Sequence, residues 1–288
     1  MVSISGARIV VLNYNGAEML PKCLPSLVEA ARAAKTPTTI TVLDNLSSDK
    51  SEDYVRTNFS EVEFVKAPEN LVLCSYNDYL KTISEPIAIL LNNDIRVDSG
   101  FIDPLMRKFE EDPGTFLVAP RVMTFDGMAI EAVDTRAGIK FGMFWANARY
   151  PGYEAHAMVP AETFASGFGA ISREKFLALG GYDLRYLPGI MEDADLCLTA
   201  RRGGYRSFYE PKSVVYHMGQ ASFKKAFTNL RRETIAHRNN FLFMRKNFPG
   251  ARDRVLHYLF LPLRLIWAAV RGRWGFLLGF CEALKRKS

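Results

Sequence analysis

The sequence has few cysteines and no pairing pattern among them. Its 288 residues include four cysteines, none in a CxxC motif, at Cys23, Cys74, Cys197 and Cys281. Scattered single cysteines argue against a disulfide framework and against a zinc knuckle. They suit a protein that works in a reducing compartment.

Two nucleotide-binding signatures are also absent. No GxGxxG follows the first apolar segment, and GxxxxGK[ST] occurs nowhere in the chain. These absences disfavour a dinucleotide-dependent dehydrogenase and a P-loop enzyme. The opening residues, "MVSISGARIVVLNYNG", lack a basic segment followed by a long apolar one, so we expect no signal peptide.

The excess positive charge is confined to the end of the chain. Residues 251–288 carry eight basic and two acidic residues, whereas the other 250 residues carry 29 of each sign. Arg264, Arg271 and Arg273 interrupt the apolar residues there, so no uncharged stretch approaches the roughly 18–20 residues that span a bilayer. Leucines, aromatic residues and arginines together favour a helix in the headgroup plane of an anionic membrane. The alternative is a helix pair packed on the preceding domain. We expect no nucleic-acid partner, because no recognised binding module accompanies the charge.

The first half of the sequence alternates apolar, β-branched segments with helical ones. We predict strands over 7–15, 39–45, 62–67 and 86–94, and helices over 17–34 and 73–83. Near-continuous apolar strands that alternate with helices indicate an α/β fold, with a mostly parallel sheet covered on both faces. The aromatic-rich residues 116–176 are expected to add strands and loops to this sheet.

Polar residues follow the predicted strands, where such sheets bind ligands. Asn13, Asp44 and Asn45 end two strands, and Asp44 either contacts a nucleoside or forms an Asx turn. Asp94 ends a third strand, where it either forms a turn or holds a divalent cation together with a diphosphate. His217 ends a further apolar segment and is either structural or a metal ligand beside Asp94.

Three acids crowd into four positions at Glu192, Asp193 and Asp195. The residues after them have helical spacing, and Gly203–Gly204 provides a helix stop. Acids in a first helical turn interact favourably with the helix dipole. The cluster is therefore either an ordinary helix start or the source of a catalytic carboxylate.

Seven segments in this order resemble one family. They are "VVLNYNG", "VLDNLSSDKS", "LLNNDI", "ASGFGAISREKFLALGGYD", "MEDADLCLTARRGGY", "VVYHMG" and "HRNNFLFMRKNFPG". The series is similar to the family 2 glycosyltransferases, in particular their bacterial rhamnosyltransferase-like branch, from about residue 8 to 245. The resemblance implies a GT-A catalytic domain over 1–250, followed by a basic, apolar helical tail over 251–288. It also implies inverting transfer from a nucleoside-diphosphate sugar.

The resemblance assigns roles to individual residues. Asp193 matches the catalytic base, with Glu192 and Asp195 supporting it, and Asp94 and His217 match positions that reach a divalent Mn²⁺ or Mg²⁺ ion. The nucleotide-sugar-binding positions it implies are Asn13, Asp44, Asn45, Asn70, Asn77, Asn93 and Gly167. We further predict that like-charge repulsion from Glu192 and Asp195 raises the pKa of Asp193, partly offset by the helix dipole.

One segment departs from the family pattern. Relatives usually read Asn-x-Gly-Phe-Ala-x-Gly-Asn, whereas this chain reads "ENLVLCSYND", with Val72 and Tyr76 in place of the two glycines. Glycine permits a close backbone approach, so we expect a differently shaped donor pocket.

The partners expected from the resemblance are a UDP or dTDP sugar donor, a glycan or lipid-linked acceptor, and an anionic membrane surface. Residues 137–156 are the expected acceptor contact, and the cytoplasmic face of a bacterial inner membrane is the expected location, in polysaccharide biosynthesis at the cell envelope. Two alternatives remain. A sugar nucleotidyltransferase would need a basic, glycine-rich loop after the first strand, where only Lys22 is available. A non-catalytic, membrane-associated assembly subunit would bind no nucleotide.

Overall fold

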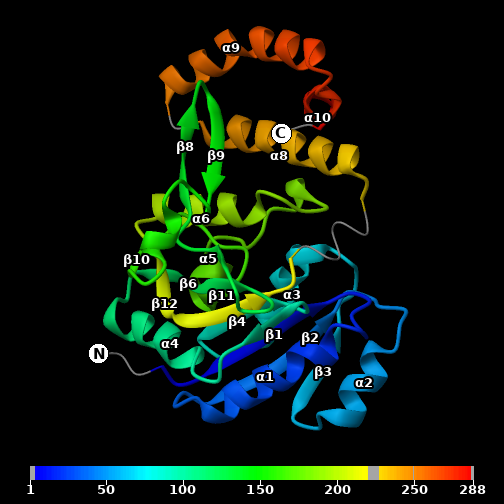
Figure 1. Cartoon of the computed structure of the whole chain (residues 1–288), viewed down its shortest axis with the longest axis vertical. Helices are drawn as coiled ribbons and strands as arrows, with labels where there is room; N and C mark the ends of the chain where they lie inside the picture. The colour runs from blue at the N-terminus through cyan, green and yellow to red at the C-terminus, as the bar shows by residue number, and fades with distance from the viewer. Residues whose placement is uncertain (1–3, 220–226, 249, 287–288) are drawn as a thin grey trace.

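The computed structural model describes residues 4–219, 227–248 and 250–286 (Figure 1). Within that part of the chain, one mixed sheet has the strand order β10-β12-β6-β11-β4-β1-β2-β3, with β5 paired to β12 and β7 to β6. Its parallel half is built from β1 (Ala7–Asn13), β2 (Thr38–Asp44), β3 (Val62–Lys66) and β4 (Ile87–Asn92). The predicted α/β class and the four predicted strands are confirmed.

Helices cover both faces of the sheet, as the apolar strands require. One face is covered by α1 (Leu20–Ala33), α2 (Ser51–Asn58) and α4 (Ile102–Glu111). The other is covered by α3 (Tyr76–Thr82), which follows the short helix η1 (Val72–Ser75), and by α5 (Arg173–Ala178) and α6 (Glu192–Arg202). Alternate strand residues divide between the two cores: Ile9 and Val11 face α1, whereas Val10 and Leu12 face α3.

The predicted additional strands join the same sheet, except for one hairpin, and the sheet becomes mixed at β11. This strand runs antiparallel to both β4 and β6, whereas β6 and β12 are parallel to one another. The strands of this half are β5 (Ile95–Val97), β6 (Thr115–Thr124), β7 (Ile130–Ala132), β10 (Ala161–Glu162), β11 (Gly169–Ser172) and β12 (Arg206–His217). Short helices η2 (Tyr153–His156) and η3 (Leu184–Tyr186) lie in the connections.

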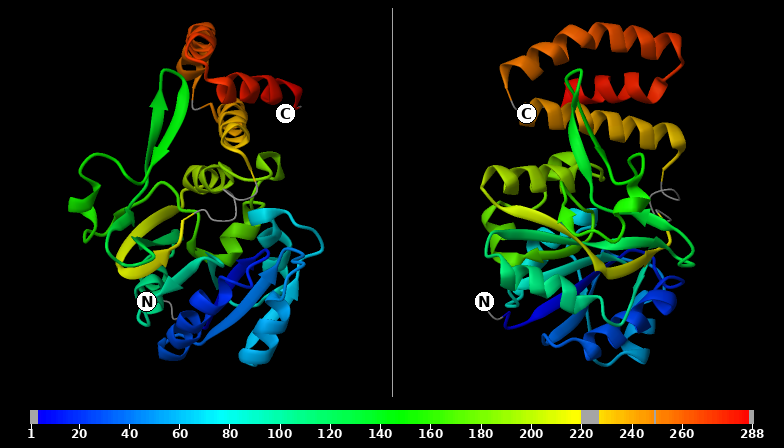
Figure 2. Two further views of the ribbon diagram at one scale, coloured as in Figure 1. Left: turned by 45° about the vertical axis from the view of Figure 1, so that its right-hand side comes forward. Right: turned by 60° about the vertical axis from the view of Figure 1, so that its left-hand side comes forward.

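A hairpin separate from this sheet projects toward the last helices. It consists of β8 (Arg136–Lys140) and β9 (Met143–Asn147), and Figure 2 shows it rising beside α8 (Asn229–Asn247) to reach α9 (Ala251–Val270). Its two turn residues, Phe141 and Gly142, have φ angles of 51° and 71°, which match a type I′ turn. The His257 Nδ1–H donates to the Gly142 carbonyl at 2.7 Å and ties the tip to α9.

The final helix, α10 (Trp274–Lys285), packs closely along α8. Gly275, Gly279 and Ala283 are buried and lie on one face of α10. A Cβ atom at Gly279 would lie 2.8 Å from the backbone nitrogen of Arg238 on α8. The two glycines therefore permit the helix backbones to approach one another. None of the helices in the described ranges has the length and apolar character needed to cross a membrane.

Candidate active site

A chain of buried polar side chains joins the carboxyl ends of three neighbouring strands. The Asn13 Nδ2–H donates to Asp44 Oδ1 at 2.8 Å, and the Asn93 Nδ2–H donates to Asn13 Oδ1 at 2.8 Å. All three side chains are almost fully buried. Parallel pairing of β1 with β2 and β4 brings these strand ends together. The sheet thus assembles three residues predicted to face the nucleotide.

Gly16 lies against this chain and was not identified from the sequence. A Cβ atom there would come 2.1 Å from Asn13 Oδ1 and 2.3 Å from Asn93 Nδ2. Such distances exclude any side chain without displacement of the two amides. The glycine of "NYNG" is the sequence signal that could have identified this close approach.

Asp44 and Asn45 form both a turn and part of the site. Asp44 Oδ2 accepts from the Ser47 backbone N–H at 2.9 Å, so its carboxylate closes a turn that is one residue longer than the Asx turn considered above. Asn45 is buried and donates through Nδ2 to the Val72 carbonyl at 3.2 Å. Val72 occupies a position where the family resemblance predicts glycine, and its φ of 52° lies in the left-handed region. This loop therefore keeps the backbone that favours glycine while carrying a β-branched side chain there.

Asp94 and His217 meet at the boundary between β4, β5 and β12. His217 Nε2 lies 3.6 Å from Asp94 Oδ2, and both side chains are largely buried. On the other side of the ring, His217 Nδ1 lies 3.2 Å from Glu131 Oε1, and Arg149 pairs with the same carboxylate at 3.1 Å. Glu131 orients the histidine and was not identified from the sequence, because nothing in the short β7 segment distinguishes it.

The three clustered acids begin α6, as predicted, and the helix ends at Gly203. Burial, with a further contribution from the charge of Asp193, raises the pKa of Glu192 to about 8. Burial also raises the pKa of Asp193. The direction predicted for Asp193 is present, but burial causes it, rather than repulsion from Glu192 and Asp195.

The Asp195 side chain joins α6 to α8 by hydrogen bonds. Its carboxylate accepts from the Tyr186 hydroxyl at 3.0 Å, from Lys246 Nζ at 2.5 Å and from Asn247 Nδ2 at 2.5 Å. Lys246 and Asn247 both lie in the last turn of α8. Both carboxylate oxygens of Asp195 therefore already have partners, and what they hold in place is α6.

The loop before α6 adopts a strained backbone that α8 holds in place. Ile190 and Met191 have φ angles of 74° and 89°, values that non-glycine residues seldom adopt. The Asn239 amide nitrogen lies 2.6 to 2.8 Å from the carbonyls of Tyr186, Gly189 and Ile190. The buried Arg238 donates to the Leu187 carbonyl at 2.6 Å. These contacts fix the direction in which α6 presents Glu192 and Asp193.

Two adjacent residues connect the carboxylates of α6 with the Asp94–His217 pair. A side chain built at Gly167 would contact Asp193 Oδ2 at 3.7 Å, so the backbone passes close to that carboxylate. The next residue, Phe168, has its ring centroid 5.7 Å from that of the His217 imidazole, and the two rings are tilted by 49°. Asp193 and His217 therefore flank one dipeptide, and the residues predicted for base and metal lie around the same segment.

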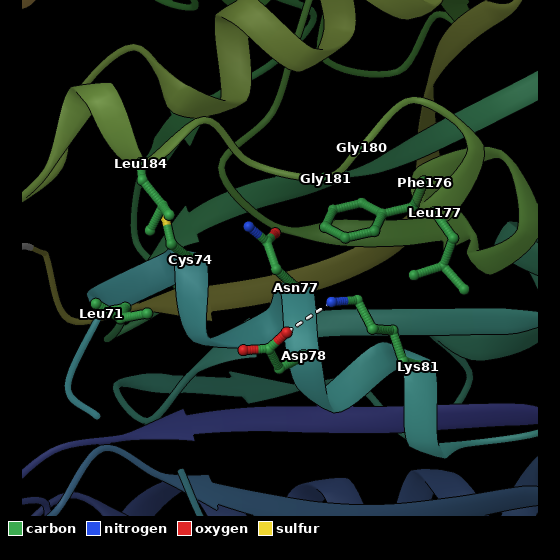
Figure 3. A pocket seen from close by; sticks show the side chains of 10 residues that line it. All are labelled: Leu71, Cys74, Asn77, Asp78, Lys81, Phe176, Leu177, Gly180, Gly181 and Leu184. Carbon is green, nitrogen blue, oxygen red and sulfur yellow. Dashed lines mark hydrogen bonds and ion pairs between the residues drawn. The ribbon is translucent and has the colours of Figure 1, made fainter. Parts of the chain in front are cut away.

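Two of the predicted binding residues have other partners. The exposed Asn70 accepts from the Val72 backbone N–H at 3.2 Å within its own turn. The Asn77 amide exchanges two hydrogen bonds of 2.8 Å with the backbone of Tyr182. Asn77 also lines a pocket of about 340 Å³ between α3 and α5 (Figure 3), where Asp78 and Lys81 pair with one another at 2.7 Å. The polar groups of that pocket are thus satisfied internally.

Three predicted site residues each keep one buried oxygen atom without a hydrogen-bond partner among the described residues. These atoms are Asn45 Oδ1, Asp94 Oδ1 and Glu192 Oε2. A buried acceptor without a partner is costly, so at an expected binding site such an atom is available to a ligand. The pattern favours the strand ends and the start of α6 as one binding site.

The residues around Asp94 fit a divalent cation that a ligand helps to hold. Asp94 offers a free, buried carboxylate oxygen, and His217 turns Nε2 toward the same carboxylate. Hard cations prefer such oxygen ligands. Within the described residues no group of three or more His, Cys, Asp or Glu side chains could hold a metal alone. A cation here would need oxygens from a bound diphosphate.

Solved structures with the same fold are glycosyltransferases. GalNAc-T7 with UDP, GalNAc and Mn²⁺ matches with a TM-score of 0.62 at 17% identity, over 82% of this chain and 47% of that one. The mannosyltransferase PcManGT from Pyrobaculum calidifontis, with GDP-Man and Mn²⁺, matches with a TM-score of 0.59 at 18% identity, over 98% and 76%. S. aureus TarS 1–349 with UDP-GlcNAc gives 0.56 at 12% identity, over 89% and 71%.

These likenesses establish the GT-A fold that the sequence predicted. The chain spans about half the length of the GalNAc-T7 chain. No curated protein matches the sequence significantly.

The family model Glycosyl transferase family 2 matches residues 8–179, which run from β1 to the end of α5. The matched span contains the strand-end residues Asn13, Asp44 and Asp94, and it ends before Asp193 and His217. It covers more than half of the sequence. The chain therefore belongs to glycosyl transferase family 2.

Proposed function

We propose that this protein is an inverting glycosyltransferase. It moves a sugar from a nucleoside-diphosphate donor to a hydroxyl of a glycan or lipid-linked acceptor by metal-assisted direct displacement. The observation that carries the proposal is the set of unpartnered buried oxygens on Asn45, Asp94 and Glu192. They occur at the nucleoside, metal and base ends of a single expected donor site.

In this proposal Asp193 is the general base. An alcohol becomes an effective nucleophile when a carboxylate removes its proton as the new bond forms. A raised pKa makes Asp193 a better proton acceptor, provided that it remains ionised at the working pH. Glu192, with a pKa of about 8, holds its own proton at neutral pH and so limits the negative charge beside the base.

The donor lies against the strand ends. Asn13, Asp44 and Asn93 form a rigid, buried base for the nucleotide, and Asn45 offers its free oxygen to a donor N–H or hydroxyl. Asp94 and His217 would hold a Mn²⁺ or Mg²⁺ ion with the diphosphate. A cation bound there neutralises the charge that develops on the leaving diphosphate.

The family branch suggests rhamnose from a dTDP donor as the first substrate to test, with UDP-sugars beside it. The hairpin and the residues after it, within 137–156, are where we propose that the acceptor is contacted. We place the enzyme at the cytoplasmic face of a bacterial inner membrane, where lipid-linked acceptors are available.

The test is a thermal-shift screen of nucleotide-sugars with Mn²⁺, with Mg²⁺ and with a chelator. A donor at about 100 times its Kd raises the free energy of unfolding by about 2.7 kcal/mol, because it binds only the folded chain. We expect one donor to raise the Tm, and the metal-dependent part of the rise to disappear in Asp94→Asn.

Asp53→Asn, which changes an exposed aspartate of α2, is the matched control and should retain the full shift. Absence of a shift with every donor, together with absence of donor hydrolysis, would favour the non-catalytic subunit instead. A metal-dependent shift that persists in Asp94→Asn would contradict the assigned metal ligand.

A further inference from the structure

The outer face of α9 is a continuous row of exposed apolar side chains. Seven of them are each between 52 and 80% exposed: Val255, Tyr258, Leu259, Leu263, Ile266, Trp267 and Val270. Their spacing of three and four residues places them on one side of the helix. A soluble helix normally turns such a stripe toward the protein core, whereas here the stripe faces outward. We call these residues the α9 row.

The charges of α9 lie at its ends and not within the row. Arg252 and Arg254 are exposed in the first turn, on either side of the partly buried Asp253, and Arg271 and Arg273 are exposed just past the last turn. Arg264 turns inward, where burial lowers its pKa. The row is therefore an apolar strip bounded by arginines at both ends.

The hairpin tip extends this surface. Phe141 is 58% exposed and its ring lies 5.3 Å from that of Phe260 on α9. Lys140 beside it is exposed and adds a further positive charge. The hydrogen bond from His257 to Gly142 fixes the tip to α9, so both belong to the same end of the molecule (Figure 2).

We infer that the α9 row, its arginine ends and the hairpin tip dock the enzyme on an anionic lipid bilayer. α9 then lies in the headgroup plane, with the apolar side chains inserted and the arginines against lipid phosphates. This inference deepens the proposed function, and it rests on that function only for a lipid-linked acceptor. The hairpin that we propose to contact the acceptor would then touch the membrane at its tip.

The charge pattern favours a bilayer over a second copy of the chain. In either a parallel or an antiparallel pair of α9 helices, arginine ends would meet arginine ends. Like charges brought together across an interface oppose association. An anionic headgroup layer complements both ends of the row at once.

The experiment measures co-sedimentation of the full chain with phosphatidylcholine vesicles, with and without phosphatidylglycerol. We expect the wild-type protein to bind the phosphatidylglycerol vesicles, and binding to weaken at high salt. Leu259→Glu combined with Ile266→Glu should lower this binding by about tenfold or more, because two charges must then enter the acyl boundary. Both positions are highly exposed, so the variant should fold, which an unchanged Tm would verify.

The matched control is Met128→Glu combined with Val159→Glu, which adds the same charge at exposed apolar positions outside the α9 row. It should bind like the wild type. A protein that retains only Trp267, after Trp145→Phe and Trp274→Phe, should be quenched by brominated lipid. Equal binding by the α9 variant and its control, or unquenched Trp267, would overturn the inference. So would a wild-type dimer in sedimentation equilibrium that only the α9 variant dissociates, because a second copy would then cover the row.

Vesicle binding needs neither donor nor metal, so the two proposals fail separately. A protein that binds vesicles but neither binds nor hydrolyses a nucleotide-sugar refutes the proposed function alone. If the protein hydrolyses its donor but does not bind phosphatidylglycerol vesicles, only the inference of a membrane-docking surface is refuted.

Discussion

Glu192 and Asp193 are neighbouring carboxyl groups that differ in their exposure to solvent. Glu192 is almost fully buried, with one oxygen lacking a partner among the described residues. Asp193 keeps partial contact with solvent and lies beside the Gly167 backbone. Under the proposed function, this difference in environment suits the partly exposed carboxylate of Asp193 to proton abstraction and the buried carboxyl of Glu192 to holding a proton.

The raised pKa of Glu192 predicts a specific dependence of stability on pH. Between its ordinary pKa of 4.5 and the folded-state value of about 8, the folded chain binds more protons than the unfolded one. The free energy of unfolding should therefore fall as pH rises through this window, by up to about 1.4 kcal/mol per pH unit. In Glu192→Gln this contribution disappears, so the stability of the variant relative to wild type should increase with pH.

Urea unfolding of both proteins at several pH values across the window measures this difference. Glu29→Gln, which removes an exposed carboxylate from α1, serves as the control for loss of one negative charge. A difference between Glu192→Gln and wild type that stays constant with pH would show that Glu192 is ionised throughout.

Sequence reasoning at the residue scale succeeded where a side chain ends a strand. Asn13, Asp44 and Asn93 lie at the ends of apolar strands, and parallel pairing brings their side chains into one hydrogen-bonded chain. Prediction from the sequence missed Gly16 and Glu131, whose roles depend on contacts between segments far apart in the sequence. The hydrogen bonds of Asn77 with Tyr182 and of Asp195 with α8 could not be predicted for the same reason.

At the scale of single elements, α8 holds the loop that precedes Glu192 and Asp193, the proposed catalytic carboxylates. Left-handed backbone at a non-glycine residue costs about 1–2 kcal/mol, and Ile190 and Met191 adopt it consecutively. Asn239 compensates by donating to the carbonyls of that loop. The helix therefore acts as a positioning element for α6.

Asn239→Ala should relax the loop and misplace Asp193. Loss of its buried donor destabilises the chain by about 1–3 kcal/mol. We expect kcat for donor hydrolysis to fall while the Tm rise caused by donor binding persists, since the strand ends are untouched. The neighbouring Asn240→Ala is a matched control, because the Asn240 amide donates to the Phe144 carbonyl in the hairpin.

Donor hydrolysis needs no acceptor, so it reports on α6 rather than on the hairpin. If Asn239→Ala and Asn240→Ala lose stability alike and leave kcat alike, α8 has no positioning role. Recovery of kcat in Asn239→Gln, which restores an amide, would support positioning over general destabilisation.

Element prediction was most accurate for the repeating β and α segments of the first half. Continuous apolar strands separated by helical spacing leave few alternative arrangements. The hairpin of β8 and β9 escaped prediction, because it pairs only with itself and packs on α8 and α9 instead of the sheet. Its position depends on tertiary contacts that no local pattern encodes.

Across the whole molecule, the last helices form a structural unit with the hairpin and α8 rather than an isolated tail. Of the two interpretations of the basic, apolar end of the sequence, packing on the preceding domain describes α10, whereas contact with a membrane surface stays a proposal for α9. α10 packs through its small residues on α8, whereas α9 leaves its apolar row exposed. Composition alone could not separate them, because both helices contain leucine, tryptophan and arginine or lysine.

The buried Arg238 links this unit to the loop before α6. Burial, and to a lesser extent the charge of Arg286, lower its pKa to about 10, and Glu282 on α10 lies 3.6 Å away. The same guanidinium donates to the Leu187 carbonyl. The end of the molecule with the α9 row is thus connected through α10 and α8 to the loop before Asp193.

The central claim is that one molecule unites a base at Asp193 with a donor site at the strand ends. The most direct measurement compares Asp193→Asn with wild type in two assays: turnover of the donor identified by the thermal-shift screen, and the Tm rise that this donor causes. Asparagine keeps the shape of the side chain but cannot accept the proton, so turnover should fall by about 100- to 10,000-fold. The Tm rise should remain close to that of wild type. Turnover near the wild-type rate in Asp193→Asn would contradict the account.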